Sequence, residues 1–301
     1  MTTHTTIIEA LTREQRLELL QRSDRAGLMH LSGHWGAIIF VGALIHQQVP
    51  YWEWLLPVQG VLIISTFSLL HEAIHKTPFQ TAWLNSMAAH VSGFLVMIAP
   101  LWFRHFHTDH HRYTNNPEKD PELATPKPRS WPQYLWHLSG LPVWWSQIKT
   151  LFANALFPNR DPYVPDKDRK RVRNEAIVFL GGYIGMAFYT VSADDFLFIW
   201  LWAVPVIIGQ PFLRAYLLAE HGGCAMVDNM LENTRTTFTT ALIRFLMWNM
   251  PYHTEHHAFP AVPFHKLPEF HAYVGPHLKV TSDGYSEFHK SYTRLLGTQE
   301  A

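Results

Sequence analysis

Three histidines in the last quarter of the chain have a spacing that suits metal binding: His253, His256 and His257. On a helix they would stand at positions i, i+3 and i+4, which places three imidazoles on one face. The spacing recurs in a second triplet, and a further pair stands at i and i+4: His107, His110 and His111, then His71 and His75. Imidazole is a common ligand of iron, zinc, copper and nickel. Three such clusters therefore predict a metal site, and the number of histidines favours more than one ion.

The composition narrows the possible ligands to histidine. The 301 residues include 20 His but only one Cys, Cys224, which excludes an intrachain disulfide framework and any Cys-rich zinc or iron–sulfur site. Lys and Arg together number 24 and balance 24 Asp and Glu, so nothing points to a nucleic-acid partner. The mean hydropathy is near zero because apolar runs alternate with very polar stretches. Since the runs approach the ~20 residues that span a bilayer, we expect a membrane protein with a large polar part.

Four apolar runs predict an all-α integral membrane fold with four transmembrane helices in two hairpins. The spans cover residues 28–48, 52–70, 175–191 and 196–218. The two turns, 47–53 and 192–195, contain no Lys or Arg, whereas the polar segments hold almost all of them. By the positive-inside rule, the histidine clusters and both termini are cytoplasmic.

The rest of the chain divides around these spans. Residues 1–27 are expected to form a cytoplasmic amphipathic leader, either on the membrane surface or in solvent. Residues 28–275 would form a single membrane domain, in which 104–174 is a long polar stretch. Residues 276–301 would form a cytoplasmic tail.

Residues 80–102 are also apolar enough to suggest a span. If they crossed the bilayer, His107 would lie ~30 Å from His75, on the opposite face. A shared metal centre forbids that separation. We therefore expect a non-spanning segment at about 80–102, either re-entrant or interfacial, and a helical cytoplasmic cap that carries the histidine clusters.

Other uses of histidine explain the pattern less well. His71-Glu72-Ala-Ile-His75 fits the zinc metalloprotease pattern, with Glu72 as general base, but one zinc ion would leave two complete triplets unused. A metal transporter would place its ligands along a path through the bilayer, whereas these gather at one face. His105 lies off the helical face of its neighbours and is left out of the ligand set. Most remaining histidines are read as surface or core residues: His4, His30, His34, His46, His137, His265, His271, His277 and His289.

The three clusters resemble the histidine boxes of the membrane fatty acid desaturase and hydroxylase superfamily. The flanks at residues 112–122, 249–260 and 262–268 also resemble desaturase sequences, and the resemblance runs from about residue 30 to residue 275. It implies a non-haem di-iron centre, with two Fe and with O2 as co-substrate, at the cytoplasmic ends of four spans. It also implies a ninth ligand after the fourth span, where this chain has His221.

Several acidic and amide side chains stand beside the expected ligands. Metal-bound imidazoles usually donate their other N–H to a carboxylate or a carbonyl, which fixes the ring orientation. In one branch of the superfamily an Asn before the ninth histidine holds a metal-bound water. Here that position is Leu217, and Asn249 is a possible substitute. The candidate partners are Glu72, Asp109, Asp120, Glu220, Asn249 and Glu255, with Glu122 further along.

The expected activity is oxygen-dependent desaturation of a fatty acyl chain. Hydroxylation, decarboxylation or ketolation of a lipid or hydrocarbon remains the alternative, but the flanks resemble desaturases more. The sequence has no His-Pro-Gly-Gly haem motif and no Gly-rich dinucleotide fingerprint. We therefore expect a separate electron donor, such as ferredoxin or cytochrome b5 with its reductase. The basic run at 167–173 is either its docking site or, more simply, a membrane anchor.

Overall fold

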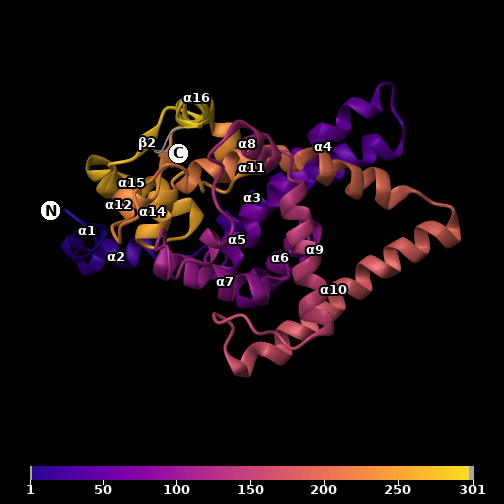
Figure 1. Ribbon diagram of the computed structural model, residues 1–301, viewed down its shortest axis with the longest axis horizontal. Coiled ribbons are helices and arrows are strands. Elements are labelled where there is room, and N and C mark those ends of the chain that lie inside the picture. Colours follow the sequence, from indigo (N-terminus) through magenta and orange to yellow (C-terminus); the bar gives the residue numbers. More distant parts are fainter. Residues whose placement is uncertain (1, 298–301) are drawn as a thin grey trace.

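The computed structural model describes residues 2–297, which are mostly helical (Figure 1). Four helical runs are long and apolar enough to cross a membrane. They are Arg13–His46, with α2 (Arg13–Leu19) and α3 (Asp24–His46); Trp52–His75, with η1 (Trp52–Trp54), α4 (Leu55–Ile64) and α5 (Thr66–His75); α10 (Asp166–Ala193); and Ile199–His221, with η3 (Ile199–Ala203) and α11 (Val204–His221). The expected helical fold with four candidate spans is confirmed.

Two helices in these runs, α5 and α10, extend well beyond the apolar stretches that predict them. The sequence predicts spans at 52–70 and 175–191, but α5 continues at its C-terminal end and α10 begins earlier. Hydropathy leaves out these polar turns, although in α10 an i,i+3 ion pair such as Asp168–Arg171, at 3.1 Å, supports the helix. The helices therefore continue beyond their apolar parts, and in α5 the continuation carries the first histidine pair.

The segment predicted at 80–102 bends sharply. α6 (Ala82–Leu95) and α7 (Pro100–Tyr113) meet at 97°. At the bend the Ile98 amide donates to the Gly93 carbonyl at 2.8 Å, and a Cβ on Gly93 would lie only 2.4 Å from the Ile98 carbonyl. The segment between His75 and His107 runs away from the histidine clusters and back again. The ring centroids of His75 and His107 therefore lie only 5.0 Å apart. A single straight crossing of a ~30 Å hydrocarbon layer would not allow this.

Two helices rich in large apolar residues lie within 104–174, so the prediction of one long polar stretch is wrong over residues 131–157, where Lys149 is the only Lys, Arg, Asp or Glu. They are α8 (Trp131–Leu138) and α9 (Leu141–Leu156), preceded by η2 (Pro121–Ala124). Gly140 joins them with φ 73°, a left-handed conformation that favours glycine. A Cβ at this position would also lie 2.3 Å from Cγ of Gln210 in α11. The turn therefore packs directly on the fourth candidate span.

The remaining elements surround the histidines. They are α1 (His4–Ala10), α12 (Met230–Asn233), α13 (Ala241–Leu246), α14 (His253–Ala258), η4 (Phe264–Lys266), α15 (Leu267–Val274), η5 (Gly275–His277) and α16 (Tyr285–Leu295), with β1 (Thr236–Thr237) paired in parallel with β2 (Thr281–Ser282). Ile7, Leu11 and Leu19 of the leader are buried in the core cluster that includes Val274 of α15. The apolar side of the leader thus faces protein. α16 likewise packs on α11, so the C-terminal segment is part of the same body.

Backbone contact between α4 and α11 fixes the two helices that lead to the histidines. A Cβ on Gly60 would lie 2.2 Å from the Pro205 carbonyl oxygen, and one on Gly209 would lie 2.3 Å from the Gly60 carbonyl oxygen. Only glycine fits at these two positions of the helix crossing. The contact sets the separation between α5, which continues α4, and the histidine end of α11.

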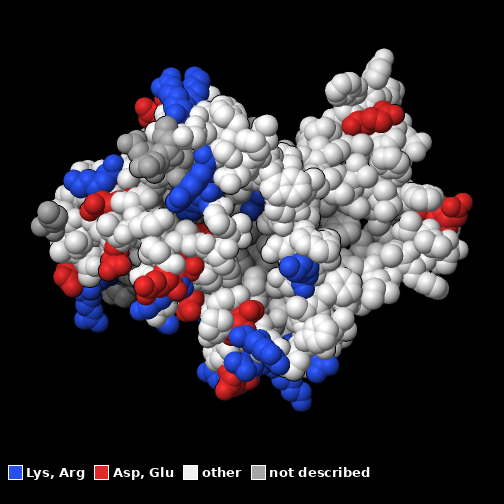
Figure 2. Space-filling view, in the orientation of Figure 1, with Lys and Arg blue, Asp and Glu red and all other residues white. Residues whose placement is uncertain are grey.

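Charged residues are distributed unevenly over the molecule. In Figure 2 they gather over the end that holds the cap elements and the start of α10, while the other half of that face is nearly free of charge except at its tips. The turns between the spans, 47–53 and 192–195, hold acidic residues but no basic ones. Such a split between an uncharged part and a charged cap is typical of a membrane protein.

Candidate metal centre

The fold brings the ends of several helices together. His71 and His75 end α5, the second triplet ends α7, and the third opens α14. The ring centroids of His71 and His107 lie 4.3 Å apart, and those of His71 and His256 lie 4.6 Å apart. Segments far apart in the sequence therefore share one site.

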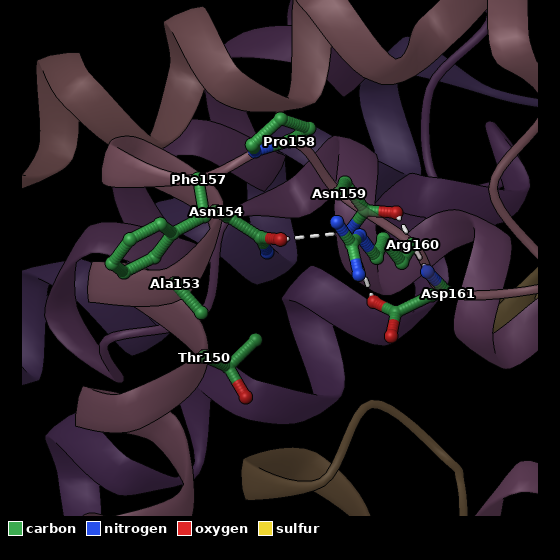
Figure 3. Close-up of a pocket in the computed structure, with 8 residues that line it drawn as sticks. All are labelled: Thr150, Ala153, Asn154, Phe157, Pro158, Asn159, Arg160 and Asp161. Atoms are coloured by element: carbon green, nitrogen blue, oxygen red, sulfur yellow. Dashed lines mark hydrogen bonds between the residues drawn. The ribbon is translucent and has the colours of Figure 1, made fainter.

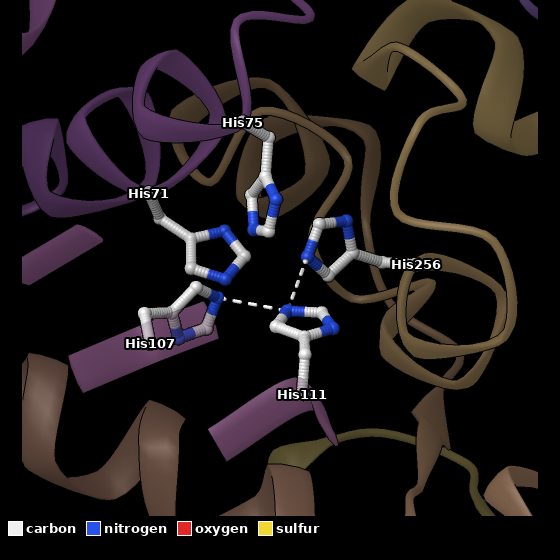
Figure 4. A group of neighbouring side chains, drawn as sticks. All are labelled: His71, His75, His107, His111 and His256. Atoms are coloured by element: carbon white, nitrogen blue, oxygen red, sulfur yellow. Dashed lines mark hydrogen bonds between the residues drawn. The ribbon is translucent and has the colours of Figure 1, made fainter. Parts of the chain in front are cut away.

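Five histidines form the first group, which we call the five-histidine group (Figure 4): His71, His75, His107, His111 and His256. One ligand nitrogen from each lies within 4.8 Å of the others. Nε2 of His111 is 2.8 Å from Nε2 of His107 and 3.2 Å from Nε2 of His256. The rings in Figure 4 point toward a common centre.

The other four predicted ligands form a second group beside the first, the four-histidine group. His110, His221 and His257 lie within 4.8 Å of one another. Nε2 of His221 is 3.2 Å from Nε2 of His110 and 3.1 Å from Nε2 of His253. The two groups adjoin where His111 and His257 stack, with ring centroids 4.0 Å apart. All nine histidines predicted as ligands are thus together, and metal binding by them stays a prediction.

The donor set fits two metal ions. Nitrogens that bind one ion at about 2.1 Å would lie about 3 Å from each other, close to the Nε2 separations of 2.8–3.2 Å. Buried nitrogens of His71, His75 and His257 have no hydrogen-bond partner among the described residues. Unpaired buried polar atoms are costly, and an ion bound to them would remove that cost.

Burial also favours the neutral, metal-binding form of the imidazoles in the third triplet. It lowers the pKa values of His253, His256 and His257 well below the usual range, and the neighbouring imidazoles lower them further. A charged imidazolium is disfavoured where water is excluded and other imidazoles are close. The rings are therefore neutral, and a neutral ring has the lone pair that a metal requires.

Three of the predicted carboxylates lie against the outer nitrogens of the histidines. Nδ1 of His110 is 2.9 Å from Asp120, Nδ1 of His253 is 3.3 Å from Glu220, and Nδ1 of His256 is 3.6 Å from Glu72. Such partners fix the tautomer and the orientation of a ligand ring. Asp120 thus turns Nε2 of His110 inward through a hydrogen bond, whereas Glu220 and Glu72 lie close to Nδ1 of His253 and His256 without a hydrogen bond to them.

Two other expected partners lie elsewhere. Asp109 faces Arg112, with 3.5 Å between the charged atoms, because a residue next to His110 on a helix points away from its neighbour's face. Asn249 precedes α14 rather than lying one turn back within it, since it has φ 57°. Its amide donates to the Phe264 carbonyl at 3.0 Å. Neither side chain makes the expected contact.

Glu255 is fully buried but does not contact a clustered histidine in the way expected. Its two oxygens receive hydrogen bonds from Thr236, at 2.6 Å, and from His271 of α15. His271, read from the sequence as an isolated histidine, therefore ties α15 to the helix that carries the third triplet. No spacing signal links these residues, because their contact depends on the packing of two short helices.

Further groups support the rings: Glu122 is expected from the sequence, whereas Thr114 and the Asn233 carbonyl are not. Glu122 reaches within 3.2 Å of Nδ1 of His110, and the Thr114 hydroxyl lies 3.1 Å from Nδ1 of His257. Nδ1 of His221 donates to the backbone carbonyl of Asn233 at 3.1 Å. Glu122 and Thr114 lie close to the second triplet in sequence, which is a weak signal. A backbone carbonyl gives no signal at all, since every residue has one.

The histidines left out of the ligand set have structural contacts. Nε2 of His105 is 3.3 Å from Asp168 at the start of α10. His34 is fully buried in α3, where Nε2 donates to the Leu62 carbonyl at 2.9 Å and Nδ1 accepts from the Trp248 indole at 3.2 Å. His34 thus anchors the turn that precedes the third triplet.

Asp120→Asn is expected to weaken metal binding at the four-histidine group by about 10- to 100-fold, because the charge that orients His110 is lost. The measurement is competition for iron against a chelator of known affinity. Asp109→Asn is the matched control on the same segment, since Asp109 pairs with Arg112 instead. Equal affinities for the two variants would contradict this role of Asp120.

His271→Ala is expected to lower the free energy of unfolding by about 1–3 kcal/mol, because a buried acceptor on Glu255 loses its partner. The hydrogen bond to Glu255 raises the pKa of His271, so the pair stabilises fully below the ordinary histidine pKa of about 6.5. This contribution is lost as the pH rises through the raised value. Thermal unfolding of both proteins across this pH range measures it, and the variant should lack that dependence.

The family comparison covers this whole site. The model of the fatty acid desaturase family matches residues 49–289, which include all nine clustered histidines. The chain belongs to the fatty acid desaturase family. Membership implies an oxidoreductase that acts in a membrane context on lipid.

The curated relatives are distant desaturases with different named substrates. The chain is 24% identical over 267 residues to an sn-1 oleoyl-lipid 12-desaturase of Picosynechococcus, covering 78% of this chain and 73% of the relative. It is 23% identical to a sphingolipid delta(4)-desaturase of Xenopus tropicalis, over 72% of this chain and 65% of that protein. A dihydrorhizobitoxine desaturase of Bradyrhizobium elkanii is 25% identical over 81% of this chain and 73% of the relative.

The metalloprotease alternative fits the structure poorly. A general base must reach a water on the metal, but Glu72 is fully buried. One of its oxygens already accepts from the Thr77 hydroxyl at 2.9 Å and from the Phe264 amide at 3.1 Å. In this desaturase Glu72 instead ties the end of α5 to the segment after α14.

Proposed function

We propose that this protein is an oxygen-dependent fatty acyl desaturase that inserts a C=C bond at a histidine-held pair of iron ions. The observation that carries the proposal is the pair of adjoining histidine groups, five and four, in a member of the desaturase family. One ion in each group would use all nine imidazoles. The relatives named for oleoyl lipid and sphingolipid favour a lipid acyl chain as substrate.

Iron bound in the two groups would supply the oxidation chemistry: O2, two electrons and two protons are consumed, two hydrogens leave neighbouring carbons, and two waters form. The chain's own residues bind and orient. Neutral imidazoles offer their inner nitrogens, and Asp120 holds the outer nitrogen of His110 by a hydrogen bond. Glu220 and Glu72 lie 3.3 and 3.6 Å from the outer nitrogens of His253 and His256. The substrate carbon must be fixed against this centre, since placement decides which hydrogens are removed.

The membrane arrangement is part of the proposal. We place the histidines, the leader and the C-terminal segment on the cytoplasmic side, with the turns at 47–53 and 192–195 outside. Figure 1 supports this arrangement, since α1 and α16, the first and last helices, lie toward the same end as α14. Electrons would come from a separate carrier, such as ferredoxin or cytochrome b5 with its reductase, reaching the cytoplasmic face.

Product analysis tests the proposal directly. The protein is expressed in a host without acyl desaturases, and its lipids are compared by mass spectrometry with those from a host carrying the His256→Ala variant. A loss of two hydrogens that depends on His256 supports desaturation. A gain of one oxygen would assign hydroxylation instead, and stoichiometric zinc in the purified protein would overturn the iron centre.

A further inference from the structure

The α8–α9 pair has an apolar stripe that no part of the described chain covers. Leu141, Trp145, Phe152 and Leu156 of α9 are between 44% and 65% exposed. At about 100° per residue, these four positions fall within about 60° of the helix circumference. Trp131 and Leu135 of α8, four residues apart, are 54% and 61% exposed. An exposed stripe made only of large apolar side chains needs an apolar neighbour.

The opposite side of α9 is already used within the protein. Leu151 is 4% exposed and packs in a cluster with Ala176 and Phe179 of α10. α8 contacts α11, and the Gly140 turn meets Gln210 of that helix. The pair therefore links the two later candidate spans, and Figure 1 shows α9 reaching from α11 to α10.

The position of α9 matches the boundary between the two halves of the molecule. The charged cap lies on one side of α9, and the nearly uncharged half lies on the other (Figures 1 and 2). Tryptophan side chains are enriched at this level of membrane proteins, where their rings meet both acyl chains and head groups. α8–α9 has two of them in its exposed stripes.

A polar hollow at the C-terminal end of α9 contains Arg160, a cation of the kind found where a protein meets lipid head groups. It has a volume of about 510 Å³ and is lined by Thr150, Ala153, Asn154, Phe157, Pro158, Asn159, Arg160 and Asp161 (Figure 3). The Asn159 amide donates to Asn154 at 2.7 Å and to Asp161 at 2.9 Å, so the polar side is ordered. In Figure 3 Phe157 points away from these groups, and it is 63% exposed. Arg160 is also exposed, beside the basic start of α10.

We propose that α8 and α9 lie in the plane of the membrane interface, with their apolar stripes in the lipid and Arg160 at the level of the phosphates. The occupant of the exposed face is thus a phospholipid monolayer, which offers acyl chains to the stripe and anions to the cation at its end. The pair then holds α10 and α11 at the depth where they leave the bilayer. The histidine groups lie on the cap side of this plane. The assignment is independent of which acyl chain is oxidised.

Single-cysteine labelling tests this surface in the full-length protein. Cys224 is the only cysteine in the sequence, so Cys224→Ser gives a background for Trp145→Cys and Leu156→Cys in the stripe. Ser146→Cys is the matched control, since this position is exposed but lies on another face of α9. Each variant is labelled with an environment-sensitive fluorophore and placed in phosphatidylcholine–phosphatidylglycerol vesicles. Iron content identifies the variants that have folded.

The readout is quenching by phospholipids that carry a spin label near the head group. We expect several-fold stronger quenching at positions 145 and 156 than at 146, in whichever stripe variant folds. Equal quenching on both faces would overturn the proposal. A blue-shifted emission at 145 and 156 without lipid quenching would also overturn it, since it would show that another protein or a second copy covers the stripe.

Discussion

Replacement of His256 by alanine is expected to lower the desaturation rate by at least about 100-fold. This loss exceeds the roughly 10- to 100-fold that is typical when a residue hydrogen-bonded to a metal ligand is replaced. His256 belongs to the five-histidine group, and its side chain is fully buried. Its Nε2 lies 3.2 Å from Nε2 of His111. Removal of the ring leaves an ion site with one donor fewer and a void that water can enter. Iron content per chain should fall with activity.

His105→Ala is the matched control for this change. His105 is on α7, which also carries the second triplet, but it pairs with Asp168 and has no place in either group. Its removal should leave iron content unchanged and activity within about two-fold, as for a partly exposed ion pair. If both variants lost iron equally, the loss would reflect damage to α7 or to overall folding, and the assignment of His256 would fail.

Gly209→Ala should have the second large effect, far from the histidines in sequence. The added Cβ would lie 2.3 Å from the Gly60 carbonyl oxygen, where α4 and α11 meet backbone to backbone. Overpacking of this kind costs about 1–3 kcal/mol. Because α4 leads to His71 and α11 ends at His221, separation of the helices also shifts the two groups against each other. A displacement of about 1 Å can lower activity by about 100-fold.

Gly185→Ala provides the comparison, because a Cβ at Gly185 of α10 would meet nothing within 4 Å. That variant should unfold no earlier than wild type, since alanine is favoured over glycine in a helix. The measurements are the apparent melting temperature in detergent, the iron content and the product yield. Unchanged values for Gly209→Ala would show that the two helices move apart freely, and would remove the crossing as a determinant of the site.

Much of the architecture follows from local patterns. Apolar runs of sufficient length define the four candidate spans, because a helix in lipid must satisfy its backbone internally. The lack of basic residues at 47–53 and 192–195 separates the two ends of the molecule. The exact helix ends do not follow, since α5 and α10 continue through polar turns that hydropathy ignores. α8 and α9 are missed for a different reason, because each apolar helix is too short to span a bilayer and lies between more polar segments.

The carboxylates show where local patterns stop being informative. Asp109, Asp120 and Glu255 all stand near a histidine box, yet only Asp120 lies against the outer nitrogen of a clustered ring. Asp109 is turned outward by its place on α7. The Glu255 carboxylate instead accepts hydrogen bonds from Thr236 and His271, which are distant from the histidine box in sequence. Adjacency in sequence does not reveal which acceptor a ring will find after packing.

The sequence by itself determined the chemistry: histidines at i, i+3 and i+4 on helices at one end of a membrane fold. Only the tertiary structure decided how they divide. His110 and His111 are adjacent, but they belong to different groups, and so do His256 and His257. The reason is geometric, since neighbouring side chains on a helix diverge by about 100°. Each triplet therefore contributes to both groups, and the packing of α5, α7, α11 and α14 determines which ring meets which.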